Sequence, residues 1–192
     1  RINIPPFTLI GDTTKYSFLS APLRDRFGHI FRLDFYSVSE IETILERSAG
    51  ILNFSIEREA RGKIAACSRR TPRVANRLLK RVRDFTQLEG VSDISLKITE
   101  KSLEALGIDH KGLDQMDREL LRTLIEKFQG GPVGLNTISA ATREEAGTIE
   151  EVYEPYLIQL GMLDRSPRGR IATEHAYKHL GLKSKTPDKL FT

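Results

Sequence analysis

Arg24 and Arg26 lie two positions apart in the segment LRDRFG, residues 23–28. The guanidinium of arginine is permanently charged, and its N–H donors form a rigid fork that fits a phosphate. The segment follows Pro22 and is expected to form a turn or a short helix. From there an arginine could pair with Asp25, or it could project from the surface and complete the phosphate site of a neighbouring subunit. These residues leave both interpretations open.

Arg73 is a second candidate for phosphate binding. It follows Thr71 and Pro72, residue types that favour the N-cap and the first position of a helix. Arg73 would therefore lie in the first helical turn, where unpaired backbone N–H groups already favour an anion. The alternative is that Arg73 is one of many solvated cations, because ten Lys and Arg face a single acidic residue between positions 58 and 83.

Arg165, Arg168 and Arg170 belong to a third basic segment. The run SPRGR, residues 166–170, predicts the tip of a β-hairpin. Arginines on such a tip fit the minor groove or the backbone of DNA. The helix that precedes the hairpin carries Glu150, Glu151 and Glu154, which repel phosphate. Any DNA contact is therefore expected from the hairpin, without dependence on base sequence.

Thr13 and Thr14 follow the apolar run FTLIG, residues 7–11, which predicts a short buried strand. Open sheets of nucleotide-binding folds present polar groups to a ligand from such strand ends. Ordinary turn chemistry is the alternative interpretation. One strand cannot bury both of its faces against so little preceding chain, so we expect the rest of its sheet to lie outside this sequence.

The elements that must position these residues change in character along the chain. A second short strand is expected at residues 30–35. Helical periodicity then predicts a small helical domain, with Ser39, Thr71 and Thr99 as N-caps of three helices and Ile64, Ala65 and Cys67 in another. Its basic residues are expected mainly on the outside of the helix that begins at Pro72.

The last third of the sequence predicts the order helix, strand, helix, helix, strand, turn, strand, which is typical of a winged helix. Pro155 lies inside one of these helices and should kink it. The expected elements are a helix at 117–128, a turn with at most a one-residue ladder at 130–134, helices at 136–141 and 147–160, strands at 162–165 and 170–173, and a helix at 174–180. A loose tail is expected from 183 to 192.

Composition excludes several classes of protein. The 192 residues carry a net charge of +4 and no apolar run long enough for a membrane span, and the N-terminal residues lack the apolar stretch of a signal peptide. The single cysteine cannot form an internal disulfide, and with four scattered histidines it offers no zinc spacing, so we expect no metal site and a cytoplasmic location. No G-x-x-x-x-G-K-[ST] motif and no strand ending in paired acidic residues is present. This chain alone is therefore not expected to hydrolyse a nucleoside triphosphate.

Six strings of the sequence together resemble the bacterial RuvB family of AAA+ motors, which drive branch migration of Holliday junctions. The resemblance is collinear and covers nearly the whole chain. The strings are PPFTLIG at 5–11, PLRDRFG at 22–28, TPRVANRLL at 71–79, GGPVGL at 130–135, TIEEVYEPYLI at 148–158 and PRGR at 167–170.

The resemblance implies a mainly α fold with small β elements, in three parts. Residues 1–37 would be the C-terminal end of a large AAA+ α/β ATPase domain, residues 38–110 a helical lid domain, and residues 111–192 a winged-helix DNA-binding domain. Thr14, with Thr13 beside it, would act as the sensor at the strand end. Arg26, with Arg24 as the alternative, would be the arginine finger supplied to the next subunit.

The lid and the hairpin also receive roles from the resemblance. Arg73, after Pro72, would be the second sensor that reads the bound phosphates, and Arg165, Arg168 and Arg170 would contact DNA. The implied protein is an ATP-dependent DNA helicase that forms a homohexameric ring. It uses ATP and Mg²⁺, although the magnesium ligands are not in this chain. Its partners are double-stranded DNA, the Holliday junction, a RuvA-type junction-binding protein and the RuvC resolvase, and no membrane.

Two positions depart from the family pattern. Asp12 stands where the pattern Ile-Gly-Ala-Thr-Thr has alanine, which places a negative charge close to the sensor. Arg70 stands where the pattern Arg-Gly-Thr-Pro-Arg has glycine, which removes a flexible residue at a hinge-like place. The rival hypothesis is a non-catalytic DNA-binding adaptor or regulator built from the helical domain and the winged helix.

Overall fold

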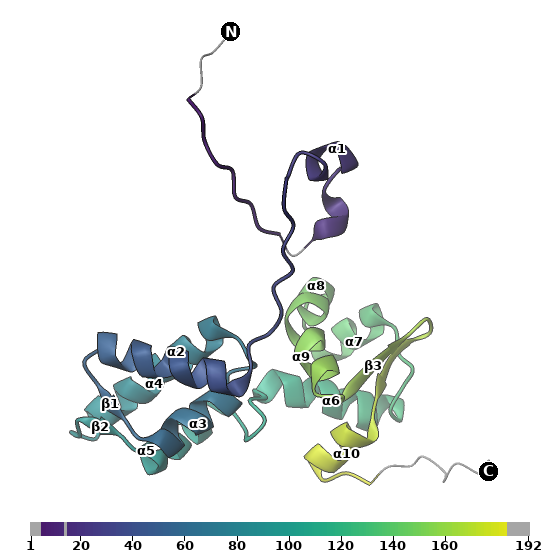
Figure 1. The fold of residues 1–192 in the computed structure, drawn as a ribbon. Helices are drawn as coiled ribbons and strands as arrows, with labels where there is room; N and C mark the ends of the chain where they lie inside the picture. The colour runs from purple at the N-terminus through teal and green to yellow at the C-terminus, as the bar shows by residue number, and fades with distance from the viewer. Residues whose placement is uncertain (1–4, 14, 184–192) are drawn as a thin grey trace, which may run out of the picture. The chain divides into compact units, whose positions relative to one another are not determined.

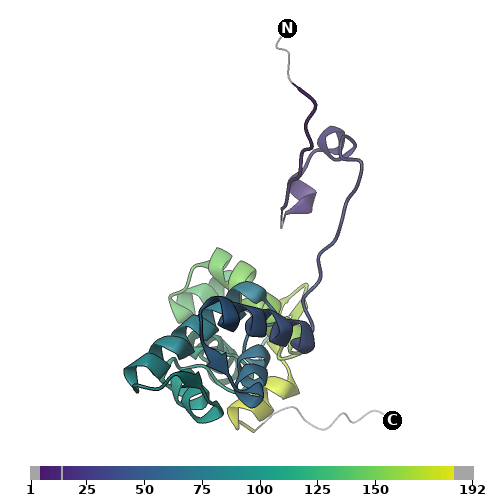
Figure 2. The same cartoon turned by 60° about the vertical axis from the view of Figure 1, so that its left-hand side comes forward.

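The computed structural model describes residues 5–13 and 15–183, in two units that meet between Asp34 and Phe35. Each unit is described by itself. Figure 1 traces both, and Figure 2 gives the same ribbon from another side.

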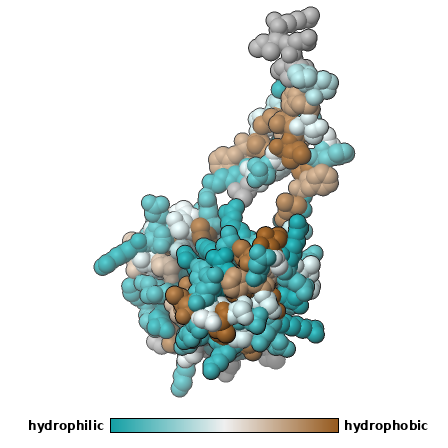
Figure 3. Space-filling view, turned by 90° about the vertical axis from the view of Figure 1, so that its left-hand side faces the viewer, coloured by the Kyte–Doolittle hydropathy of each residue, from teal (hydrophilic) through white to brown (hydrophobic). Residues whose placement is uncertain are grey.

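The first unit contains a single turn of 3-10 helix, Tyr16–Phe18, and the short helix α1, Ala21–Arg24. The strands expected at residues 7–11 and 30–35 do not form. A strand needs a neighbour to pair its backbone N–H and C=O groups, and the described part of this unit supplies none. Most of its large apolar side chains are exposed, and Figure 3 shows them as brown atoms on this unit. Apolar surface of this extent is typical of a face that contacts another protein segment.

The second unit begins with a helical domain that has its own core. Four helices surround Ile41, Leu45, Ile64, Leu79 and Val82, all of which are fully or almost fully buried. Its elements are α2 at Val38–Ile51, β1 at Ser55–Ile56, α3 at Arg58–Ala66, α4 at Pro72–Leu88, β2 at Asp93–Ile94 and α5 at Leu96–Ala105. The two strands pair in parallel, Ser55 with Asp93 and Ile56 with Ile94.

Two of the three expected N-caps of this domain lie elsewhere. Helix α2 is capped by Ser37 rather than Ser39, in a capping box with Glu40. Helix α5 is capped by Ser95 rather than Thr99, and Thr99 is fully buried one turn inside the helix. The expectation for α4 holds, since Thr71 occupies the N-cap position and Pro72 follows it.

The rest of the second unit is a winged helix with a separate core. The buried residues Leu120, Leu124, Ile138, Leu157 and Leu163 join its helices to its hairpin. Its elements are α6 at Gln115–Phe128, α7 at Leu135–Thr142, α8 at Ala146–Thr148, a π-helical turn η2 at Ile149–Tyr153, α9 at Glu154–Gln159, β3 at Leu163–Ser166, β4 at Gly169–Ala172 and α10 at Glu174–Leu180. Strands β3 and β4 are antiparallel, and Val133 adds a one-residue bridge to Arg170, as predicted. The fold is therefore mainly helical with small sheets, which confirms the predicted class.

Pro155 is accommodated by a change of helix type. It is the second residue of α9, and the five residues before α9 form the π turn η2. Proline has no N–H to donate, and a widened turn is one way for a helix to continue past that missing bond. The π turn therefore lies directly before the proline, at the place where the kink was expected. Within residues 5–13 and 15–183, no helix is both long and apolar enough to cross a membrane.

Candidate functional site

The threonine pair near the N-terminus is only partly described. Thr13 is exposed, and its Oγ1 accepts a hydrogen bond of 3.0 Å from the backbone N–H of Lys15. This is local turn chemistry. Thr14 lies outside the described residues.

The structure distinguishes the two arginines of the first unit. The guanidinium of Arg24 lies over the ring of Tyr16, 5.2 Å from its centroid, and the residue is half-buried. Arg26 is exposed just after α1, and no described residue pairs with its side chain, Asp25 included. Because Arg26 keeps its donors available, it suits a phosphate supplied by another subunit better than Arg24 does.

Arg73 occupies the first turn of α4, as predicted, with Pro72 at the first helical position. The hydroxyl of Thr71 does not cap this helix, because it donates instead to the carbonyl oxygen of Arg69 at 2.9 Å. The N–H groups of the first turn therefore receive no bond from the N-cap side chain. Arg73 is exposed and unpaired among the described residues, so a guanidinium and a helix N-terminus are available to the same anion.

Arg73 continues into a basic stripe along one side of α4, formed with Arg77, Lys80 and Arg81. All four side chains are at least partly exposed, and none pairs with an acidic side chain of the described chain. They line a groove of about 470 Å³ whose one acidic residue, Asp84, already pairs with Arg83 at 2.7 Å. Uncompensated positive charge at this spacing repels itself and favours a polyanion nearby.

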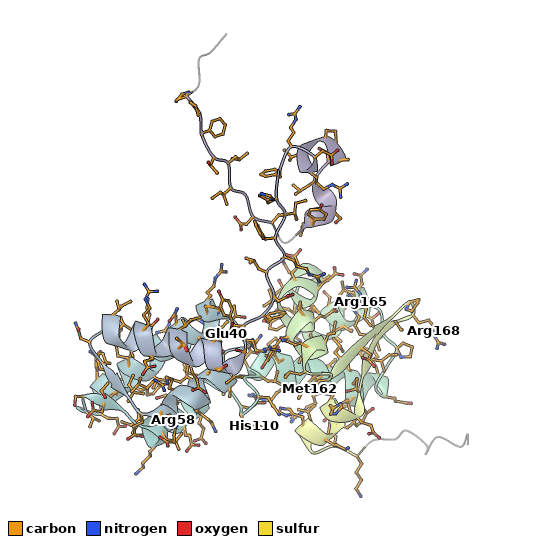
Figure 4. All side chains as sticks on the ribbon, in the orientation of Figure 1. Glu40, Arg58, His110, Met162, Arg165 and Arg168 are labelled. Carbon is orange, nitrogen blue, oxygen red and sulfur yellow. The ribbon has the colours of Figure 1, made fainter. Side chains whose placement is uncertain are left out.

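The hairpin arginines have three different environments. Arg168 is exposed and projects from the tip between β3 and β4 in Figure 4. Arg165 pairs with Glu150 at 2.5 Å and is half exposed. Arg170 is directed into the domain, where its Nε and Nη2 donate to the two oxygens of Glu154 at 2.6 and 3.2 Å, and its side chain is only 10% exposed.

These pairs change the expected roles in two ways. Arg170 is poorly placed for the predicted contact with DNA, because its guanidinium is buried and already satisfies the carboxylate of Glu154. In turn, Glu150 and Glu154 do not present free negative charge beside the hairpin, since Arg165 and Arg170 neutralise them. The repulsion expected from this helix is therefore weaker than the sequence suggests.

Gly169 fixes the close approach of the hairpin to the loop at residues 130–134. Its φ is +135°, and a Cβ there would lie 2.3 Å from the carbonyl oxygen of Val133. Only glycine fits such a contact with another backbone. The motifs GGPVG and PRGR are thus two sides of one packed joint, which holds Arg168 at the tip.

Known protein families match the chain in three consecutive segments. Residues 1–33 match the model for the Holliday junction DNA helicase RuvB P-loop domain, and residues 36–109 match the RuvB AAA lid domain. Residues 110–181 match the RuvB C-terminal winged helix domain. The chain belongs to the RuvB family.

Relatives of known name agree with this RuvB assignment. The Holliday junction branch migration complex subunit RuvB of Koribacter versatilis (strain Ellin345) is 52% identical over 99% of this chain. The chain spans 53% of the length of that relative. The activity of a whole RuvB protein is therefore a proposal for this chain.

Solved RuvB structures superpose on the fold described above. The RuvB Holliday junction branch migration motor of Thermotoga maritima has a TM-score of 0.82 and 51% identity, over 89% of this chain and 57% of that chain. A single-residue variant of the same Thermotoga maritima protein gives a TM-score of 0.87 at 52% identity, over 97% of this chain and 61% of its own.

Sequence reasoning missed one cluster of polar residues in this RuvB chain. Arg69, between α3 and α4, reaches Asp114 and Asp117 at the start of α6. Asp117 is fully buried, and burial raises its pKa from the ordinary 3.8 to about 6, although the charge of Arg69 opposes that rise. Burial also raises the pKa of the adjoining Tyr156 to about 12. The N-cap signal of Asp114 was readable, but Arg69 was hidden among neighbouring basic residues.

Among residues 5–13 and 15–183, no group of three or more His, Cys, Asp or Glu is placed to hold a metal ion. The candidate functional residues are instead three exposed arginines: Arg26 just after α1, Arg73 in the first turn of α4, and Arg168 in the turn between β3 and β4.

Proposed function

We propose that this chain supplies the C-terminal parts of an ATP-driven DNA helicase subunit that moves the branch point of Holliday junctions. The observation that carries the proposal is the exposure of Arg26, Arg73 and Arg168, none of which pairs with a described residue, at places matched by RuvB domain models. A guanidinium left free at three such places is suited to phosphates of nucleotide and DNA.

Each arginine has a separate part in the proposed reaction. Arg26 of one subunit stabilises the charge that develops on the transferring phosphoryl group in the next subunit, so hydrolysis depends on ring assembly. Arg73, together with the start of α4, binds the nucleotide phosphates and reports their presence to the lid. Arg168 contacts the DNA backbone from the hairpin tip, independently of base sequence. Thr14, with Thr13, is proposed as the strand-end sensor.

The remaining parts of the reaction lie outside this sequence. No P-loop motif is present, so we propose that the chain alone is inactive and that ATP and Mg²⁺ are bound with the help of residues elsewhere in a longer protein. The proposed assembly is a homohexameric ring in the cytoplasm, with a RuvA-type junction-binding protein and the RuvC resolvase as partners. A non-catalytic adaptor is disfavoured because residues 1–33 match a P-loop domain.

The test uses an extended protein, in which this chain follows the remaining part of a RuvB P-loop domain. Replacing Arg26 by Ala should lower ATP turnover in assembled rings on the order of a thousandfold, since an arginine finger contributes at least that much. Arg24→Ala is the matched control and should retain turnover. Steady-state phosphate release measures both.

A mixing experiment separates a residue supplied in trans from a merely structural one. Rings that combine Arg26→Ala subunits with subunits lacking the P-loop lysine should recover part of the turnover, because each subunit provides what its neighbour lacks. Unchanged turnover in Arg26→Ala rings would refute the role of Arg26. Loss in Arg24→Ala alone would transfer it to Arg24.

A further inference from the structure

The turn between α3 and α4 has an unusual backbone. Arg69 and Arg70 are consecutive non-glycine residues with φ of 54° each, in the left-handed region. L-residues with side chains adopt this region rarely, and they persist there only where surrounding contacts hold them. Arg70 occupies the position that the family pattern gives to glycine, which explains that preference. The contacts that hold this turn therefore indicate what it does.

The side chain of Arg69 is held entirely by residues of the winged helix and the segment that leads into it. Its Nε donates to the carbonyl oxygen of Gly112 at 3.3 Å, and its Nη2 donates to Asp114 at 3.0 Å and to Asp117 at 2.5 Å. The guanidinium also lies over the ring of Tyr156, 5.2 Å from its centroid. The side chain of Arg69 thus extends from the helical domain and contacts four groups of the neighbouring domain: the Gly112 carbonyl, the carboxylates of Asp114 and Asp117, and the ring of Tyr156.

The backbones of the two domains touch at the same place. A Cβ at Gly112 would lie 2.6 Å from the carbonyl oxygen of Cys67, so the backbone at Gly112 packs against the backbone at Cys67 with no room for a side chain. Hydrogen bonds within each domain hold the two sides of this contact. The Sγ of Cys67 donates to the carbonyl oxygen of Asp109 at 3.4 Å within the helical domain, and the Tyr156 hydroxyl donates to that of Lys111 at 2.6 Å within the winged helix. Arg69 therefore belongs to a close-packed joint, not to a solvated surface pair.

Arg70 makes the complementary connection within the helical domain. Its Nε donates to the carbonyl oxygen of Tyr36 at 2.8 Å, and its own carbonyl accepts from the N–H of Tyr36 at 3.3 Å. Tyr36 comes just before the N-cap of α2. Three residues after Arg70 in the chain, Arg73 stands exposed in the first turn of α4. Within five residues, Arg69 therefore contacts the winged helix, Arg70 contacts Tyr36 just before α2, and Arg73 is the proposed phosphate-binding residue.

We propose that Arg69 is a positioning residue that couples the phosphate-reading turn at Arg73 to the winged helix through Asp114 and Asp117. Arg69 touches no substrate. A shift of the α4 N-terminus on phosphate binding would move Arg69. The winged helix would move with Arg69, because the ion pairs to Asp114 and Asp117 and the close backbone contact at Gly112 connect the two domains rigidly. The proposal rests on the proposed function of Arg73, and it assigns the transmission step to particular atoms.

The first experiment measures coupling in the extended protein. Arg69→Gln should keep the kcat and KM for ATP without DNA within about twofold, while stimulation of kcat by duplex DNA falls about tenfold, within the usual range of allosteric couplings. The matched control is Arg61→Gln. Arg61 is as buried as Arg69, at 17% against 16% side-chain exposure, but its ion pair, with Glu46 at 2.7 Å, stays inside the helical domain.

If duplex DNA stimulates the kcat of Arg69→Gln as much as that of the unsubstituted protein, the proposed coupling is wrong. If Arg61→Gln loses as much stimulation as Arg69→Gln, the loss reflects reduced stability and not coupling through Arg69. If Arg69→Gln does not fold, Asp114→Asn replaces it and should lose part of the stimulation. Asp114 is 41% exposed, and asparagine caps a helix as well as aspartate does.

A second measurement keeps the proposal testable if the extended protein does not hydrolyse ATP, a result that would refute the proposed function alone. Backbone amide relaxation in the 192-residue chain should give one rotational correlation time for residues 38–105 and 115–180 together. In Arg69→Gln the two groups should separate into two correlation times. A single rotational correlation time for both groups in Arg69→Gln would show that Arg69 does not hold the two domains together.

Discussion

At the scale of single residues, pairing separates arginines that look alike in the sequence. Arg168 and Arg170 are two positions apart, yet one is exposed at the hairpin tip and the other is buried against Glu154. The exposed guanidinium is available to a ligand. The buried one compensates a carboxylate that would otherwise be left without water or a cation.

This difference predicts opposite outcomes for two alanine variants. Arg170→Ala should lower the free energy of unfolding by about 3–5 kcal/mol, because it leaves Glu154 buried and unpaired. Arg168→Ala should change it by less than about 0.5 kcal/mol. The same Arg168→Ala should weaken duplex binding and reduce the slope of log K against log salt by about 1. Urea unfolding measures the stability of both variants, and fluorescence anisotropy at several salt concentrations measures duplex binding. A loss of stability in Arg168→Ala would contradict the assignment of Arg168 as an exposed DNA contact.

Asp117 predicts a pH dependence with a definite sign. Its pKa is raised by burial to about 6 in the folded chain, against an ordinary 3.8. Between these values the folded state holds more protons than the unfolded state, so the contribution of this group to the free energy of unfolding falls as pH rises from about 4 to about 6. The loss is complete at neutral pH.

Asp117→Asn removes that titration. Relative to the unsubstituted chain, the variant should therefore gain stability as the pH rises from about 4 to about 7, by up to about 3 kcal/mol at about 1.4 kcal/mol for each pH unit between the two pKa values. Urea titrations of both proteins at several pH values give this difference. A difference independent of pH would show that Asp117 titrates normally in the fold.

At the scale of elements, local signals in the sequence predicted the helices better than their ends or their partners. Thr71 and Pro72 predicted the start of α4 correctly, because the preference of these residue types for the N-cap and the first helical position is local and needs no tertiary contact. Thr99 was misplaced as a cap because threonine also fits a buried helix position, and only the tertiary structure shows it inside α5. The ladder of β1 with β2 was not foreseen, since two-residue strands leave no periodicity.

The inward orientation of Arg170 could not be predicted from the sequence either. Its partner, Glu154, is 16 residues away on α9, and a pair at that separation depends on how the hairpin folds back. The Arg69 joint has the same character, because Asp117 is 48 residues from Arg69. Exposed candidates could be found from their motifs, whereas buried pairs required the fold.

The hairpin predicts a strong preference for glycine at one position. Gly169→Ala should destabilise the winged helix by at least about 1–3 kcal/mol, because φ of +135° and the contact with the Val133 carbonyl both exclude a side chain. Gly147→Ala is the control, since a Cβ there meets nothing within 4 Å and alanine favours a helix. Thermal unfolding compares them, and equal melting temperatures would contradict the close approach.

At the scale of the whole molecule, the proposed motor depends on exposed guanidiniums that bind phosphates and on a joint that transmits the effect. Arg73 and Arg168 belong to domains with separate cores, and the contacts of Arg69 connect these domains. Arg26 belongs to the unit matched by the P-loop domain model. Arg26, Arg73 and Arg168 make no described pair that holds a domain together, which is why function, rather than stability, should respond to their replacement.

The most direct test is ATP-driven movement of the branch point in a synthetic four-way junction by the extended protein. We compare it with a triple variant that carries Arg26→Ala, Arg73→Ala and Arg168→Ala, after confirming that both proteins unfold at the same urea concentration. We predict that the unsubstituted protein moves the branch point and that the triple variant does not. Equal rates for the two proteins would contradict the role of these guanidiniums.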